Sequence, residues 1–206
     1  MATTAFENKD TRYAYNSIHD FFDNYGLSGA VQDIDSILKA ATSEKPWKKA
    51  DPYSVLYFME MLGELCGAAF VIHSNYATRD EAILEEPENG DPDMSVQQHF
   101  VGRHVLWSVW DYFPRSLTAR QYHNPYKAIN KFVDFMTEAE WKKTFKEIIE
   151  YALSNNSIDD EYYPFNILTV RLRLQQLIEA CHLLEVRTNI KKATPKAKQK
   201  KKKSKN

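Results

Sequence analysis

Two residues in the middle of the chain have types that could support acid–base chemistry. His104 and Asp111 are seven residues apart, so on one continuous helix they would share a face, with Trp107 and Ser108 between them. A histidine near an aspartate in apolar surroundings has a shifted pKa, which is a frequent feature of catalytic sites. A core histidine with satisfied hydrogen bonds is the more common explanation. His104 and Asp111 are therefore candidate catalytic residues with a competing structural interpretation.

A second pattern with chemical potential is Glu179-Ala-Cys-His182. A Glu-x-x-His pair supplies part of a di-metal site in helical bundles, which also needs a second such pair and carboxylates from two further helices. Glu60 and Glu64, one helical turn apart, could supply carboxylates, but the second Glu-x-x-His pair is absent from the sequence. We therefore expect neither a metal site nor another cofactor.

Other catalytic motifs have no support in the sequence. It contains no Gly-x-Ser-x-Gly elbow, no phosphate-binding glycine loop and no Cys-x-x-Cys pair.

The acidic segment 85–93 lacks the alternating ligands of a calcium-binding loop, so we expect a solvated loop or a docking surface for the chain's own basic residues. Cys66 and Cys181 lie among apolar residues, which predicts two buried reduced thiols, with a disulfide as the alternative.

The charge of the chain is distributed very unevenly. The last sixteen residues, 191–206, contain nine lysines and no acidic residue, although the whole chain has 27 basic and 28 acidic residues. Residues 1–190 therefore carry 18 basic and 28 acidic residues, a net charge of about −10. The lysines of this tail are Lys191, Lys192, Lys196, Lys198, Lys200, Lys201, Lys202, Lys203 and Lys205.

Such a tail is suited to binding an anionic partner. Lysine ammonium groups attract phosphates without reading sequence, and the tail has no arginine or aromatic residue for bidentate or stacking contacts. We expect any nucleic-acid binding by the tail alone to be non-specific. A tail that only increases solubility is the alternative. In a eukaryotic cell, residues 200–203 would also be similar to a nuclear import signal.

Apolar residues recur at helical spacing along most of the chain, and only six glycines are present. We expect an all-α protein, a single helical bundle of about seven main helices, with residues 1–9 as a flexible lead-in, 10–190 as an acidic helical domain and 191–206 as a disordered tail. The expected helices cover residues 11–25, 28–41, 51–76, 95–112, 125–136, 137–152 and a long stretch after Pro164, with a short helical turn at 116–123. The apolar run of 105–113 predicts that the helix over 95–112 is the central one.

The N-terminus lacks the basic start and apolar run of a signal peptide. The longest wholly apolar stretch, residues 68–72, is far shorter than a membrane span. We therefore expect a cytoplasmic protein, or a nuclear one in a eukaryote, without a membrane partner.

The segment Arg12-Tyr-Ala-Tyr-Asn-Ser-Ile-His19 resembles, in its loosest form, the Arg-to-His spacing of HEPN domains. These are small all-helical proteins that are often nucleases of bacterial toxin or defence systems. The resemblance covers eight residues, and it departs from the family in its place in the first helix and in Tyr13, where a polar residue usually follows the arginine. It implies an RNase that uses Arg12 and His19. Arg103 and His104, outside the resemblance, are the other candidate pair for such a hydrolase.

The leading functional hypothesis is a non-enzymatic, intracellular interaction or regulatory protein. Its lysine tail would engage nucleic acid or an acidic protein, and its acidic body would bind a protein partner or a second copy of the chain. The HEPN-like RNase is the alternative. A structural subunit with a solubilising tail is a third hypothesis.

Overall fold

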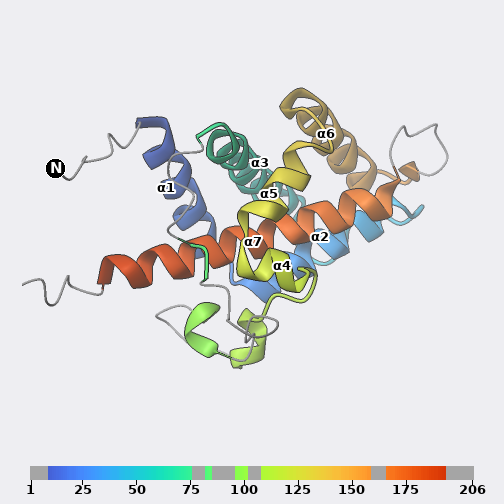
Figure 1. The fold of residues 1–206 in the computed structure, drawn as a ribbon. Coiled ribbons are helices and arrows are strands. Elements are labelled where there is room, and N and C mark those ends of the chain that lie inside the picture. The colour runs from blue at the N-terminus through green and yellow to red at the C-terminus, as the bar shows by residue number, and fades with distance from the viewer. Residues whose placement is uncertain (1–8, 76–81, 85–95, 102–107, 159–165, 194–206) are drawn as a thin grey trace, which may run out of the picture.

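Helices account for all the regular secondary structure in the part of the chain that the structure describes, which confirms the all-α prediction. This computed structural model describes residues 9–75, 82–84, 96–101, 108–158 and 166–193. The described residues form seven α-helices and two short 3-10 helices, with no strand among them (Figure 1). Their bounds are α1 Lys9–Asn24, α2 Leu27–Ala41, α3 Pro52–Ser74, η2 Gln97–His99, η3 Val109–Tyr112, α4 Ala119–His123, α5 Tyr126–Val133, α6 Glu138–Leu153 and α7 Ile167–Ala193.

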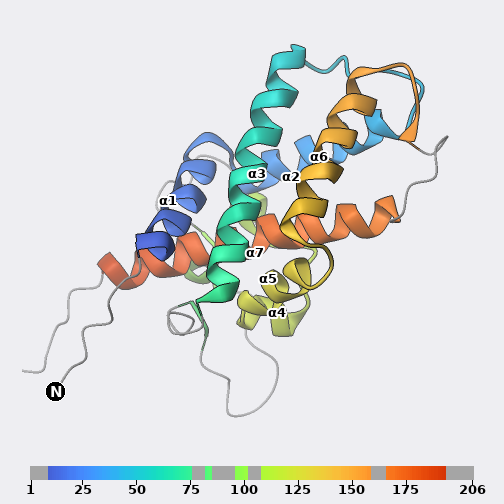
Figure 2. The ribbon, with the colours of Figure 1, turned by 90° about the horizontal axis from the view of Figure 1, so that it is seen from above.

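Helix α7 is the central element of the bundle. It packs against α1, α2, α3, α4, α5 and η2. Figure 2 shows α3 and α6 side by side, both at a steep angle to α7. Between Leu174 and Thr188 every residue of α7 is buried except Gln175 and Glu185, which are half-buried. The helix with neighbours on all sides is therefore α7.

The predicted central helix over 95–112 is wrong for its described parts. Residues 97–99 and 109–112 form two separate 3-10 helices. Ser108 has an extended backbone with ψ of 139°, and its side chain accepts a hydrogen bond from the Trp110 N–H and so caps η3. A serine that bonds to the backbone in this way favours a helix start over a helix interior. Trp110 itself is 65% exposed, so the described part of the apolar run, residues 108–113, is not a buried helix.

Several predicted helix starts are confirmed by their caps. The Asp51 carboxylate accepts a 2.8 Å hydrogen bond from the Tyr53 N–H, and Pro52 is the first residue of α3. Thr137 and Glu140 form the expected capping box at the start of α6. The predicted cap at Ser28 is wrong, because α2 begins at Leu27.

Replacing Asp51 by alanine is expected to lower the free energy of unfolding by about 1 kcal/mol, because the Tyr53 N–H loses its side-chain acceptor. Urea denaturation followed by circular dichroism measures this change. Asp51→Asn, which keeps an acceptor oxygen, is the matched control and should restore most of the lost stability. Equal losses in both variants would show that the carboxylate does not act as a cap.

Helix α3 is long and apolar enough, by length and composition, to cross a membrane. Half of that apolar stretch is buried inside the fold, where α3 packs against α1, α5, α6 and α7. A core helix of a bundle has the same length and composition, so this is a weak indication of membrane insertion.

Cys66 of α3 and Cys181 of α7 are both free thiols and fully buried, which confirms the prediction for them. Burial raises the pKa of each thiol above its usual value, so neither is a reactive thiolate near neutral pH.

Candidate functional site

Of the two residue pairs of the RNase alternative, Arg12 and His19 are both exposed on α1, and Arg103 and His104 lie outside the described residues. The His19 Nδ1 atom lies 2.9 Å from Glu185 Oε1, and its Nε2 atom lies 3.4 Å from Asp23 Oδ2. The hydrogen bond to Glu185 raises the pKa of His19, partly opposed by burial, and the nearby carboxylates add to the increase. The described contacts of His19 are thus with carboxylates.

Asp111 lies half-buried in η3, and His104 lies outside the described residues, as does the acidic segment 85–93. The prediction that His104 and Asp111 share a helix face required a continuous helix between them. Ser108 interrupts that helix, so the reason for pairing the two residues no longer holds.

Glu179 and His182 have structural roles. Glu179 is buried and accepts hydrogen bonds from the backbone N–H groups of Arg115 and Ser116, at 2.8 and 2.7 Å. His182 Nε2 lies 2.7 Å from the carbonyl oxygen of Phe100 and donates to it, because a carbonyl only accepts. Among the residues that the structure describes, no group of three or more His, Cys, Asp or Glu side chains could hold a metal ion.

Burial changes the pKa of both side chains. It raises the pKa of Glu179, although the two backbone hydrogen bonds oppose the change. It lowers the pKa of His182 to about 4, although the hydrogen bond to Phe100 opposes the change. His182 is therefore neutral in the folded protein at neutral pH.

Arg187 connects α7 to three other segments. Its side chain is only 4% exposed. Its Nε donates to the carbonyl of His99 at 3.0 Å, and its Nη1 donates to the carbonyls of Tyr122 and Ala82 at 2.7 and 3.2 Å. The guanidinium carbon also lies 4.8 Å from the centre of the Tyr122 ring. Burial lowers the pKa of Arg187 to about 10, so the side chain stays charged at neutral pH.

We call Gln176, Glu179, His182 and Arg187 the α7 clamp. Gln176 belongs to it because its Nε2 donates to the Ser116 carbonyl at 3.0 Å. All four side chains are buried and bind backbone groups of the segment 97–123 or of Ala82. Sequence reasoning missed the clamp, although polar residues recurring near helical spacing in an otherwise apolar helix were its signal.

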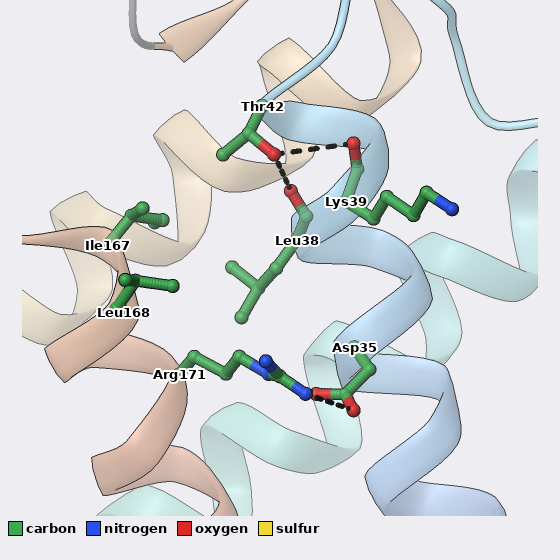
Figure 3. A pocket seen from close by; sticks show the side chains of 7 residues that line it. All are labelled: Asp35, Leu38, Lys39, Thr42, Ile167, Leu168 and Arg171. Atoms are coloured by element: carbon green, nitrogen blue, oxygen red, sulfur yellow. Dashed lines mark hydrogen bonds and ion pairs between the residues drawn. The ribbon is translucent and has the colours of Figure 1, made fainter.

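One surface pocket lies between α2 and the start of α7, with a volume of about 320 Å³. Its polar end is an ion pair in which Arg171 Nε and Nη2 each bind one Asp35 oxygen at 2.7 Å. Ile167 and Leu168 point into the pocket toward Leu38, as Figure 3 shows. The remaining lining residues are Lys39 and Thr42.

Another pocket has a volume of about 470 Å³ and lies where the end of α1, the start of α3 and the 42–50 loop meet. We call it the aromatic pocket, because five rings line it, those of Tyr25, Trp47, Tyr53, Tyr57 and Phe58. Tyr53 is 70% exposed, so its ring faces the solvent. The charged residues of the lining are Asp33, Lys49 and Asp51.

The lysine tail begins on α7. The helix continues to Ala193, so the predicted boundary at 191 falls inside it, and the backbones of Lys191 and Lys192 are helical. The other seven tail lysines lie outside the described residues.

No protein-family model, curated protein or solved structure matches this chain. The function of the protein is therefore inferred from the chemistry of its own surface.

Proposed function

We propose that this protein is a non-enzymatic, intracellular interaction protein that binds an anionic partner through the lysines of residues 191–206. The observation that carries the proposal is the charge distribution. Nine lysines and no acidic residue follow a body with a net charge of about −10. The partner is a nucleic acid or an acidic protein surface, because both present the negative charges that lysine ammonium groups attract.

The anchoring of α7 supports this proposal. Arg187 and Glu179 tie the helix to backbone groups of other segments, and residues 174–188 are buried except for the half-buried Gln175 and Glu185. The first two lysines, Lys191 and Lys192, follow within a few residues of this fixed point. Lys191 and Lys192 stand in the last turn of α7, where the helix dipole favours positive charge. The partner would therefore be held next to the folded body.

Replacing four tail lysines by glutamine is expected to reduce the salt dependence of binding to a short DNA duplex. Each lost phosphate contact lowers the slope of log Kobs against log salt by about 0.9, so the slope should fall by roughly 3 to 4. The measurement is fluorescence anisotropy over a salt series. The substitutions are K200Q, K201Q, K202Q and K203Q.

The matched control removes four exposed lysines from the body, with the same change in net charge. It combines K131Q, K142Q, K143Q and K146Q. The control should keep the wild-type slope. Equal slopes in the tail variant and in the wild type would contradict the proposal for nucleic acid. Polyglutamate is the parallel probe for an acidic protein, and binding to it should weaken in the tail variant in the same way.

The RNase alternative gains no support from the described contacts. Its histidine would have to approach a phosphate, yet His19 lies beside Glu185 and Asp23, whose charges repel phosphate. RNA cleavage that His19→Ala abolishes would nevertheless restore this alternative.

A further inference from the structure

The aromatic pocket is a surface feature that the tail does not explain. We propose that it binds bases of a single-stranded nucleic acid whose phosphates the lysine tail attracts. This inference rests on the proposed function in one respect, since it takes the anionic partner to be a nucleic acid. It adds a base-contacting site to a tail that can supply only charge.

The rings at the mouth of the pocket are arranged for stacking. Tyr53 and Tyr57, one helical turn apart on α3, have nearly parallel rings, with centroids 6.4 Å apart and an interplanar angle of 16°. Tyr57 lies in turn 6.5 Å from Tyr25. Bases stack on exposed aromatic faces of this kind without regard to sequence. Tyr53 and Tyr57 therefore provide a platform at the pocket's edge.

The wall opposite α3 is fixed before any ligand arrives. The backbone N–H of Trp47 donates to the carbonyl of Ala152 at 2.8 Å, which ties the 42–50 loop to the end of α6. Phe58, at the base of the pocket, is buried and lies 5.1 Å from Tyr25 in an edge-to-face contact. The volume of about 470 Å³ lies in the range of ordinary ligand pockets. Binding a base there requires little ordering of the protein.

The charges around the pocket permit a phosphate backbone despite the acidic body. Lys45, Lys48 and Lys49 are exposed on the adjoining loop. Lys49 Nζ lies 2.9 Å from Asp33 and so neutralises one lining carboxylate. Asp51, the other lining carboxylate, accepts a hydrogen bond from the Tyr53 N–H at the N-terminus of α3, where the helix dipole is positive. Both lining carboxylates are thus compensated, and the lysines face the solvent.

The tail can reach a strand bound at the pocket. Contacts of His19 with Glu185 and of Phe22 with His182 place the second half of α1 along α7, and Tyr25 follows at the pocket. The end of α7 at Ala193 lies about 16 Å beyond His182 along the helix. The thirteen residues after it span up to about 43 Å when extended. One strand can therefore touch both sites.

The test compares a labelled single-stranded DNA of about twelve nucleotides with an abasic strand of the same length, using the full-length protein. Wild type should bind the base-bearing strand about tenfold more tightly. Tyr53→Ala should remove most of this preference, and Tyr53→Phe, which keeps the ring, should retain it. Tyr13→Ala is the matched control, because Tyr13 is a similarly exposed tyrosine on α1 and does not line the pocket.

Two results would overturn the inference. One is equal binding of the two strands by wild type, and the other is an unchanged preference in both Tyr53→Ala and Tyr57→Ala. The tail variant separates the two proposals. If the tail variant binds the abasic strand more weakly, and wild type shows no preference for the base-bearing strand, the tail proposal is supported. The base-binding role of the aromatic pocket is then rejected. Tyr53-dependent binding of polyglutamate without binding of DNA would instead assign the pocket to a protein partner and overturn the inference.

Discussion

Replacing Arg187 by methionine is expected to lower the free energy of unfolding by about 3–5 kcal/mol. Methionine fills a similar volume but cannot donate a hydrogen bond. The carbonyls of His99, Tyr122 and Ala82 would lose their Arg187 donor. Buried acceptors without a donor cost about 1–3 kcal/mol each. The loss is a large part of the 5–15 kcal/mol that is typical of a folded domain.

Guanidinium chloride denaturation followed by circular dichroism measures this loss. Arg171→Met is the matched control, because Arg171 is also paired on α7 but lies near the surface, where its pair with Asp35 should contribute only about 0.5–1 kcal/mol. The loss of stability in Arg187→Lys should lie between those of Arg187→Met and Arg171→Met, since lysine keeps the charge but not the geometry of the guanidinium group. A loss for Arg187→Met no larger than that of the control would contradict the role assigned to the clamp.

Lowering the pH from about 6.5 toward 4 is expected to destabilise the protein through His182. Its pKa is about 4 in the folded protein, against 6.5 for an ordinary histidine. In this interval the unfolded chain binds a proton that the folded protein does not, so the free energy of unfolding falls as the pH falls. The contribution lost is about 3 kcal/mol when the interval has been crossed.

The measurement is the free energy of unfolding at a series of pH values for wild type and His182→Gln. Glutamine can still donate to the Phe100 carbonyl but does not titrate. The variant should therefore lose less stability than wild type between pH 6.5 and 4. His19→Gln is the control, because the raised pKa of His19 gives a contribution that is lost as the pH rises. If the free energy of unfolding changes with pH in the same way in wild type and in His182→Gln, His182 is not a buried neutral histidine with a lowered pKa.

Several of the helices that were predicted correctly have either one apolar face or a local start signal. In α2 the buried residues Ile34, Ile37 and Leu38 follow helical spacing, and Asp51-Pro52 marks the start of α3. The apolar run over 105–113 has no such face. Whether such a run becomes helix or loop depends on the hydrogen bonds and packing that α7 provides to the residues around it. Neighbouring residues in the sequence do not reveal these tertiary contacts.

The candidate sites differ in the same way. The lysine tail could be predicted because charge density is a property of composition alone. The aromatic pocket could not, because Tyr25, Trp47 and Tyr53 come from three segments that meet only in the folded bundle. Helical spacing places Tyr53 and Tyr57 on one face of α3, but it does not say whether another helix covers that face.

The central position of α7 has a consequence for how the chain is made. Proteins are synthesised from the N-terminus, at about 5–20 residues per second, and a domain folds once its parts are present. Here α1, α2, α3 and α5 each lack one of their packing neighbours, α7, until residues 167–193 have been added, although α1 and α3 can already pack on each other. The carbonyls of Ala82, His99 and Tyr122 also lack their Arg187 donor until that residue has been synthesised. The bundle therefore closes only after α7 has been synthesised, and the apolar faces that α7 covers are open to chaperones until then.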